Sequence, residues 1–143
     1  NKECFLVKLS ICIPVYNGSE TIAPLVRALD VTFKDMDIEV VLVNDGSRDS
    51  SAAVCKNLVA QYPYVVFVDL RRNFGEHNAV MCALNHCSGD YAVIIDDDLP
   101  VEPFSKEGST IWSTADFIFS EISANLTGVG SPEIFKRSGN VAR

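Results

Sequence analysis

The chain has 143 residues, which is the length of one domain and too short for two of ordinary size. Apolar residues make up 48% of it and charged residues 22%, so we expect a folded core and not a disordered chain. Lys and Arg number 12 against 19 Asp and Glu, giving a formal charge of −7. That balance argues against a nucleic-acid partner, which needs a broad basic face, and an acidic protein that handles phosphates needs a divalent cation or a local basic spot.

The compartment is inferred from segments that the sequence lacks. No run reaches the ~18 apolar residues of a transmembrane helix. The first ten residues lack the apolar core and the cleavage site of a signal peptide. The five cysteines share no zinc-like spacing, and most lie in apolar segments, where reduced Cys acts as a small hydrophobe. We therefore expect structural thiols in the cytoplasm or at the cytoplasmic face of a membrane, the latter in a longer form of the protein.

Four short apolar runs, rich in Val and Ile, predict the strands. They are Leu9–Val15, Ile38–Val43, Val65–Val68 and Tyr91–Ile95. The runs are continuous and do not alternate with polar residues. Continuous runs of this length are typical of strands that are covered on both faces in a parallel sheet.

Helical periodicity fills the gaps between the runs. The first helix is expected to turn Ile22, Leu25, Val26, Leu29 and Phe33 inward. The second runs from Asp49 to about Gln61 with Val54, Leu58 and Tyr62 on one stripe, and the third from about Gly75 to Cys87 with Val80, Ala83, Leu84 and Cys87 turned inward. Strands alternating with helices predict right-handed βαβ units in an α/β fold.

The pattern changes after residue 99. Residues 100–143 contain one amphipathic helix candidate, over residues 111–126, and otherwise read as turns. The sequence therefore predicts two parts, a first one over residues 1–99 and an abbreviated second one over residues 100–143.

Polar and acidic residues follow all four predicted strands. They form the segments Tyr16–Ser19, Asn44–Ser47, Arg71–Asn73 and Asp96–Asp98. Ligands of open parallel sheets gather outside the carboxyl ends of the strands. We therefore expect one ligand site at this edge.

The run Asp96–Asp98 predicts a metal site. Three consecutive carboxylates repel one another, and Mg²⁺ or Mn²⁺ relieves the repulsion while also binding phosphate oxygens. In an extended chain, Asp96 and Asp98 share one side, so they would hold the ion while Asp97 faces away. The alternative is a solvated turn that caps a following helix.

Four further residues have two interpretations each. Asp45 is placed to accept from a nucleobase N–H or a ribose hydroxyl, although Asn-Asp-Gly is also an ordinary turn sequence. Arg71 and Arg72 suit a diphosphate, or they form a solvated pair. His77 is a candidate contact, or it packs at the start of the third helix.

The four motifs, in order, resemble a known family. No G-x-G-x-x-G follows the first strand and no G-x-x-x-x-G-K-[ST] is present, so dinucleotide-binding Rossmann domains and P-loop enzymes do not match. The segments ICIPVYNGSE, VVLVNDGSRDSS, LRRNFGEHNAVMCAL and GDYAVIIDDDL resemble the nucleotide-binding half of family-2 glycosyltransferases of the GT-A fold. RNFGEHNAVM is most similar to the branch that moves sugars onto polyprenyl (undecaprenyl or dolichyl) phosphate.

The resemblance, over residues 8–99, implies a site. Its nucleotide contacts would be Pro14, Tyr16, Asn17, Glu20, Asp45, Arg72, Asn73, Asp96 and Asp97, and its metal ligands Asp96 and Asp98. Asp45 matches the acid that reads the base, usually uracil. Two departures stand out: Asn44 takes the place of a more usual Asp, and the Gln that often follows the D-x-D pair is absent.

The implied function is transfer of a sugar, with inversion, from a nucleotide donor. The donor would be a UDP sugar, with Mg²⁺ or Mn²⁺ as cofactor, and the acceptor a polyprenyl phosphate or a saccharide. The alternative is a nucleotide-sugar-binding fragment without turnover, because the acceptor half is expected to be shortened or missing. A nucleotidyltransferase is a weaker third interpretation, since the first loop lacks Lys. No catalytic base is assigned: the acids after Glu107 are Asp116, Glu121 and Glu133, and none lies in a motif.

Overall fold

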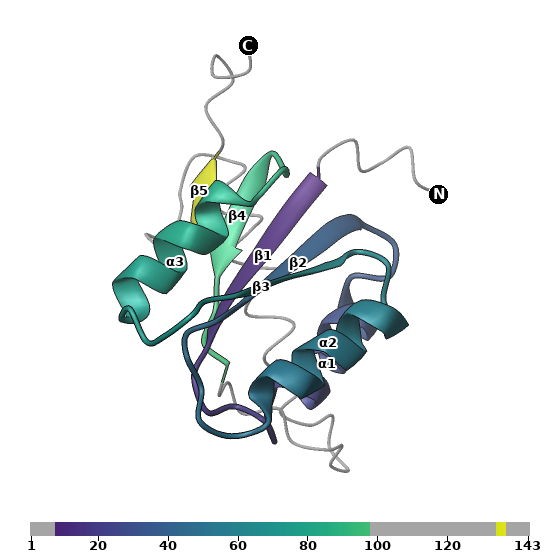
Figure 1. Cartoon of the computed structure of the whole chain (residues 1–143). Coiled ribbons are helices and arrows are strands. Elements are labelled where there is room, and N and C mark those ends of the chain that lie inside the picture. The colour runs from purple at the N-terminus through teal and green to yellow at the C-terminus, as the bar shows by residue number, and fades with distance from the viewer. Residues whose placement is uncertain (1–7, 98–133, 137–143) are drawn as a thin grey trace, which may run out of the picture.

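The computed structural model of the chain describes residues 8–97 and 134–136 (Figure 1). In chain order the elements are β1 (Lys8–Val15), α1 (Ile22–Thr32), β2 (Asp37–Asn44), α2 (Ser51–Gln61), β3 (Val65–Asp69), α3 (Glu76–Asn85), β4 (Tyr91–Ile94) and β5 (Ile134–Lys136). All four predicted strands and all three predicted helices of the first part are therefore confirmed. The candidate helix over residues 111–126 lies outside the described residues.

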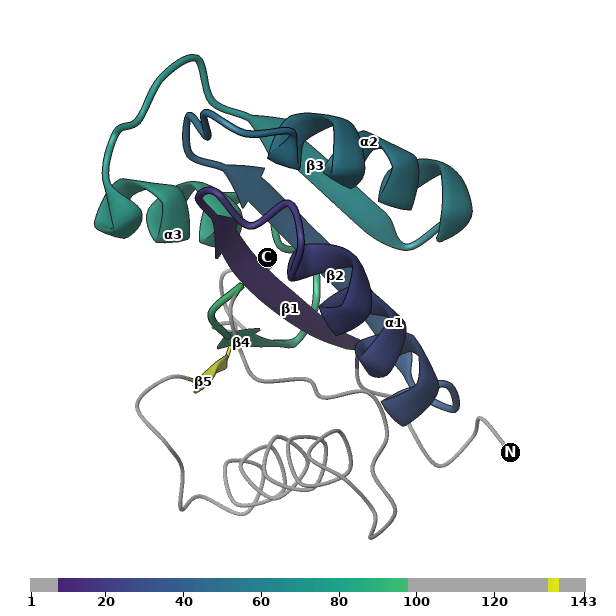
Figure 2. The ribbon, with the colours of Figure 1, turned by 90° about the horizontal axis from the view of Figure 1, so that it is seen from below.

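The strands form a single sheet in the order β3-β2-β1-β4-β5. The first four are parallel and β5 is antiparallel to β4. Helices α1 and α2 cover one face, and α3 covers the other (Figures 1 and 2). This is the predicted α/β architecture, with a mainly parallel sheet. The strand β5 shows that a piece of the second predicted part joins the sheet of the first.

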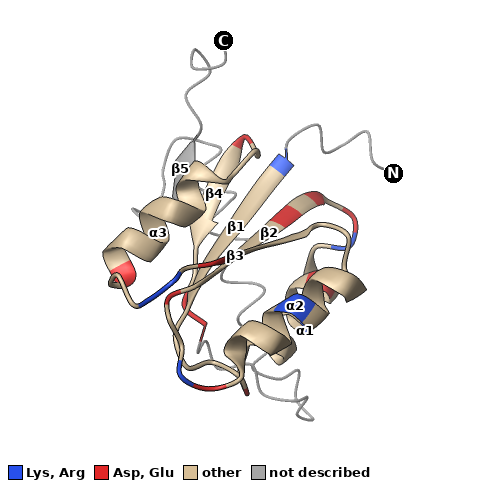
Figure 3. Ribbon diagram, viewed as in Figure 1, with Lys and Arg blue, Asp and Glu red and all other residues tan. Residues whose placement is uncertain are grey.

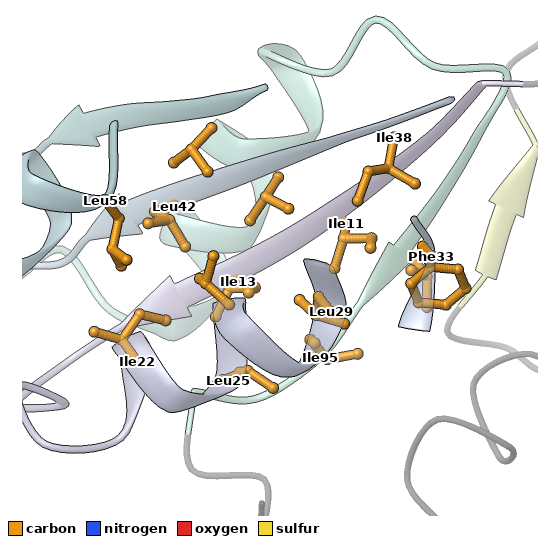
Figure 4. Close-up of a cluster of buried hydrophobic side chains, with 14 of the residues drawn as sticks. Ile11, Ile13, Ile22, Leu25, Leu29, Phe33, Ile38, Leu42, Leu58 and Ile95 are labelled. Atoms are coloured by element: carbon orange, nitrogen blue, oxygen red, sulfur yellow. The ribbon is translucent and has the colours of Figure 1, made fainter. Parts of the chain in front are cut away.

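Two apolar layers hold the helices to the sheet because alternate side chains of β1 point to opposite faces. Ile11 and Ile13 point toward α1 and α2 (Figure 4), where every member of the predicted inward stripe of α1 is buried. Cys12 points the other way, into a smaller layer with Ala79 and Ala83 of α3. The carboxyl end of β1 is thus fixed between two packed layers, which makes it a rigid base for the loop that follows.

Two predicted helix features differ in detail. Helix α2 begins at Ser51 and not at Asp49, because the Asp49 carboxylate accepts hydrogen bonds from the Ser51 backbone N–H at 2.9 Å and hydroxyl at 2.6 Å. Asp49 therefore satisfies a free helical N–H from outside the helix. On α3 the fully buried residues are Ala79 and Ala83. Val80 and Leu84 are half-buried. The part of α3 that lies deepest against the sheet is therefore formed by the two small alanine side chains.

The buried carboxylate of Glu39, on β2, joins β2 to β1 and to the segment that precedes β4. Glu39 accepts from the Ser10 hydroxyl and the Ser88 backbone N–H, both at 2.6 Å. Burial alone raises the pKa of Glu39, but these hydrogen bonds outweigh it and hold the pKa below its usual value. Gly89 fits beside Ser10 only without a side chain, since a Cβ there lies 2.6 Å from Ser10 Oγ.

None of the helices within residues 8–97 is long and apolar enough to cross a membrane.

Candidate functional site

A pocket of about 340 Å³ lies at the carboxyl ends of β1, β2 and β4. It is lined by Pro14, Val15, Tyr16, Asp45, Asn73, Glu76, Asp96 and Asp97. Six of the nine nucleotide contacts implied by the sequence are therefore brought together. The other three, Asn17, Glu20 and Arg72, are exposed and do not line it.

Asp45 is the most deeply buried polar group of the pocket, with 3% of its surface exposed. Its Oδ1 accepts from the Phe74 backbone N–H at 2.8 Å. Its own backbone N–H donates to the Val15 carbonyl at 2.8 Å, which anchors it beside β1. Among the described residues Oδ2 has no hydrogen-bond partner. A buried oxygen without a partner is costly, so this atom suits a ligand that donates a hydrogen bond.

Gly46 places the Asp45 carboxylate against the chain that follows β3. Its φ of 70° is unfavourable for other residues. A Cβ at this position would lie 2.4 Å from the Asn73 backbone nitrogen. The two loops therefore pack backbone against backbone, which brings the Phe74 N–H within reach of Asp45.

The loop after β1 is fixed by four consecutive amides, each donating to a side-chain oxygen of another loop or of the first residue of α2. The bonds are Tyr16 to Asp97 Oδ2 (3.0 Å), Asn17 to Ser47 Oγ (2.9 Å), Gly18 to Ser51 Oγ (2.9 Å) and Ser19 to Asp49 Oδ2 (3.2 Å). The Ser51 hydroxyl accepts from Gly18 while it donates to Asp49. These bonds set the direction in which Tyr16 faces the pocket.

Asn17 and Asp49 belong to this network and not to the pocket wall. Asn17 has a φ of 54°, and its Oδ1 accepts from the Arg48 backbone N–H at 2.9 Å. Asp49 is held ionised, because the Ser51 hydroxyl above all, with the Ser51 and Ser19 backbone N–H groups, lowers its pKa to about 2. Asn17, expected to contact nucleotide, thus has its carbonyl oxygen committed to the neighbouring loop.

Both described residues of the acidic run face the pocket. The expectation that Asp97 faces away is wrong: β4 ends at Ile94, so the strand alternation does not extend to Asp96 and Asp97. Asp97 Oδ2 accepts from the Tyr16 N–H, and a Cβ on Gly18 would lie 2.7 Å from the same oxygen. Asp96 is exposed at the pocket mouth.

The expected metal site is described only in part, because Asp98 lies outside the described residues. Within residues 8–97, no group of three or more His, Cys, Asp or Glu side chains is placed to hold a metal ion. Asp96 and Asp97 nevertheless offer carboxylate oxygens, the donors that Mg²⁺ and Mn²⁺ prefer. The donor set fits such an ion when completed by phosphate oxygens or water.

The loop between β3 and α3 carries two arginines, Arg71 and Arg72, and α3 begins with an acidic residue, Glu76 (Figure 3). The Arg72 guanidinium carbon lies 4.6 Å from the centroid of the Phe74 ring, a cation–π contact outside the pocket lining. Arg71 and His77 are exposed and do not line it either.

Glu76 was not singled out from the sequence, yet it lines the pocket. Its signal is its place at the start of α3, directly after Gly75 with a φ of 102°. An acidic residue there is also favoured by the helix dipole, so the position alone does not separate a ligand contact from a helix-start preference.

A second pocket, of about 520 Å³, lies between the end of α1 and the start of β2. It is lined by Asp30, Phe33, Lys34, Asp35, Met36, Asp37, Ile38 and Tyr64. Although it is larger, it lies away from the carboxyl ends of the parallel strands, and none of the candidate site residues lines it. Tyr64 donates its hydroxyl proton to Asp30 there, so this pair already satisfies itself.

Comparison with known proteins places this geometry in context. Residues 10–106, more than half of the chain, match the family model described as Glycosyl transferase family 2. The chain is 42% identical over 100 residues to the undecaprenyl-phosphate 4-deoxy-4-formamido-L-arabinose transferase of Sodalis glossinidius, covering 67% of this chain and 30% of that protein. The enzyme of the same name from an Enterobacter species is 40% identical over 100 residues, with the same coverage. The expected similarity to the polyprenyl-phosphate branch is confirmed, and the chain spans about 30% of the length of the curated relatives it matches.

Solved structures show the same fold. Mycobacterium tuberculosis glucosyl-3-phosphoglycerate synthase in complex with UDP has a TM-score of 0.63 at 19% identity, over 86% of this chain and 41% of that one. S. aureus TarS in complex with UDP-GlcNAc has a TM-score of 0.56 at 24% identity, over 80% and 32%. The mannosyltransferase PcManGT of Pyrobaculum calidifontis, in complex with GDP-Man and Mn²⁺, has a TM-score of 0.56 at 20% identity, over 75% and 31%. This likeness confirms the predicted GT-A architecture.

Proposed function

This chain belongs to glycosyl transferase family 2, and from that premise we propose that its pocket binds the nucleotide sugar donor of an inverting transfer to a polyprenyl phosphate. The donor we propose is a UDP sugar. The two chemically distinct parts of such a donor, the base and the diphosphate, suit two distinct parts of the pocket.

The proposal rests on Asp45 Oδ2, which has no hydrogen-bond partner within residues 8–97. A carboxylate only accepts hydrogen bonds, and an acceptor suits the ring N–H of uracil or a ribose hydroxyl. The carboxylate is almost fully buried, and the hydrogen bond from the Phe74 backbone N–H holds its orientation. It is therefore already oriented before a ligand binds. A partner there relieves the cost of the unsatisfied oxygen, and this favours ligands that carry a donor at that place.

The diphosphate part of the donor suits the side of the pocket that follows β4, which lies across β1 from β2 and Asp45. Asp96 and Asp97 lie there, and Asn73 adds an amide that donates to oxygens. Two carboxylates beside a diphosphate repel it. We therefore propose that Asp96 and Asp98 hold Mg²⁺ or Mn²⁺ next to the diphosphate. When bound, such an ion supplies positive charge for the leaving diphosphate. Asp97 meanwhile holds the Tyr16 amide and so keeps the first loop in place.

The proposed reaction is a single displacement. An oxygen of the acceptor phosphate forms a bond to the anomeric carbon, and the bond from that carbon to the diphosphate breaks, releasing UDP with the electron pair. A phosphate acceptor is already anionic and needs no strong general base. The proposed reaction therefore does not require a general base from the pocket. A polyprenyl acceptor places the reaction at a membrane surface, and we propose the cytoplasmic face.

A second candidate function is donor binding without turnover by this chain. It is favoured by the position of the pocket residues, all of which lie within the described residues 8–97. The two functions differ only in what happens after the donor is bound. Both require the same pocket.

Isothermal titration of UDP into the protein tests the proposal. We expect saturable binding with Mn²⁺ that weakens when EDTA is added and when Asp96 is replaced by Ala. The matched control is Asp35→Ala, an exposed acid at the second pocket, which should leave the affinity unchanged. UDP binding that is equally tight with EDTA and in the Asp96→Ala variant would exclude the proposed cation site, and no binding at all would exclude the donor site.

A further inference from the structure

Two cysteines meet between β1 and α3, on the face of the sheet opposite to α1 and α2. Cys12 Sγ lies 3.0 Å from Cys87 Sγ, although the residues are 75 positions apart in the chain. Cys12 is fully buried at the middle of β1, and Cys87 is half-buried, two residues after the end of α3. A small movement of the side chains therefore brings the sulfurs to bonding distance.

The two thiols differ in a way that suits disulfide exchange. The hydrogen bond between the two sulfurs lowers the pKa of Cys87, although burial of Cys87 opposes the change. The same contact, together with burial, raises the pKa of Cys12. The more accessible sulfur thus has the greater thiolate character, and the protected one stays a thiol until its partner has reacted.

The remaining described cysteines provide the contrast. Cys55 lies on the buried side of α2, on the other face of the sheet, and burial raises its pKa to about 12. Cys82 is half-buried one turn earlier on α3, with His86 Nδ1 at 3.9 Å. Within residues 8–97, neither has another cysteine sulfur in contact, so only one pair is placed to close.

We propose that Cys12 and Cys87 form a reversible intramolecular disulfide by exchange with a small-molecule disulfide, such as oxidised glutathione. The Cys87 thiolate attacks one sulfur of that disulfide, which gives a mixed disulfide and releases one thiolate. The Cys12 sulfur then attacks Cys87, its proton passing to water, and the second small thiolate leaves. Two protein thiols are oxidised, and one small disulfide is reduced to two thiols.

The disulfide joins β1 to the end of α3 and so closes β1, α1, β2, α2, β3 and α3 into one covalent loop. Cross-links that close long loops stabilise proteins mainly by restricting the unfolded chain. Helix α3 begins with Glu76, which lines the pocket, whereas the bond forms at its far end. The oxidised protein is therefore expected to be more stable against unfolding than the reduced protein, and its pocket is expected to stay open.

The test is to equilibrate the reduced protein with oxidised and reduced glutathione, quench with acid, alkylate all free thiols in denaturant and map the peptides by mass spectrometry. We expect a linked peptide pair containing Cys12 and Cys87, with Cys55 and Cys82 alkylated. Reduction should restore all the thiols. The oxidised form should also unfold at a higher urea concentration than the reduced form.

Two variants separate the proposal from general cysteine oxidation. Cys82→Ala should still form the linked pair, whereas Cys87→Ala should not. Because Cys87 is half-buried at the edge of the smaller apolar layer, its replacement disturbs packing less than replacement of the fully buried Cys12 would. The proposal is overturned if Cys12 remains alkylatable under oxidation, if Cys87 stops at a mixed disulfide with glutathione, or if Cys82 links in its place.

Discussion

Asp45 illustrates what a single residue contributes to this site. The sequence predicts its place, because an acid between a strand and a glycine turn lies at the edge of the sheet. It does not predict which carboxylate oxygen is already used, since the bond from Phe74 joins two loops that are far apart in the chain. The distinction matters chemically, because the oxygen bound by Phe74 is held in place while the other has its full accepting capacity for a ligand.

Replacing Asp45 with Ala should weaken UDP binding by about 1–3 kcal/mol, the usual cost of leaving a polar group without its partner. Binding of inorganic pyrophosphate with Mn²⁺ should change little, because pyrophosphate has no base. Titration calorimetry with both ligands measures the two effects. Equal losses for the two ligands would show that Asp45 supports the fold and does not contact the base or ribose.

Asp49 gives a prediction about pH. Its pKa is lowered from 3.8 to about 2 in the folded protein, so its ionised form stabilises the fold above 3.8. This contribution is lost as the pH falls toward 2, where the folded protein also takes up the proton. The stability difference between wild type and Asp49→Ala, measured by urea unfolding, should therefore shrink as the pH falls from 3.8 to about 2.

Asp35→Ala serves as the reference for that titration, because Asp35 is an exposed acid for which the structure gives no hydrogen bond within residues 8–97. Its replacement should change the free energy of unfolding little, because no hydrogen bond within residues 8–97 is lost. A difference for Asp49→Ala that does not vary with pH would mean that its charge has no part in holding the first loop.

At the scale of elements, the close approach of the loops after β2 and β3 depends on Gly46. Replacing Gly46 with Ala should destabilise the protein by more than the ~1–3 kcal/mol of backbone strain alone, because the new Cβ meets the Asn73 backbone at 2.4 Å. Gly75 is the control, since its φ is also positive but its Cβ position has nothing within 4 Å. Urea unfolding of both variants measures the difference, and a smaller loss for Gly46→Ala would contradict the close approach.

The elements were predictable where burial decides and less so where single contacts do. Continuous apolar runs place β1 and β2 to within one residue at each end, since both faces of these strands are covered. The start of α2 was misplaced because the bond between Asp49 and Ser51 is not visible as a sequence period. The inward face of α3 was predicted in part: Ala83 is buried, and Leu84 and Cys87 pack against the same layer, but the burial of Ala79 was missed. Periodicity does not reveal how closely a helix approaches the sheet.

At the scale of the whole molecule, the order of the motifs carries most of the information. Four polar segments far apart in sequence meet at one edge because parallel strands align their carboxyl ends. What the sequence did not reveal is which side chains are consumed in joining the loops. Asn17 is the example, because its carbonyl oxygen binds the neighbouring loop.

The coverage of the relatives leads to a prediction for activity. Holding an acceptor in line with the donor supplies roughly 7–11 kcal/mol of barrier reduction in favourable cases. A polypeptide limited to these 143 residues covers about 30% of the relatives' length. Tested alone, such a polypeptide is expected to bind the donor, with transfer slow or absent. An assay with radiolabelled UDP sugar and detergent-solubilised polyprenyl phosphate measures this. Transfer into the organic phase at about 1 s⁻¹ or faster would contradict the prediction.

The central claim, that a uridine nucleotide binds at the carboxyl ends of the strands, is tested most directly by NMR of the ¹⁵N-labelled protein titrated with UDP and Mg²⁺. The largest saturable shifts should fall on the backbone amides of Tyr16, Asp45, Phe74, Glu76 and Asp96. The amides around the second pocket, at Asp35 and Tyr64, should not move. Largest shifts at the second pocket, or no saturable shift at the first, would contradict the account.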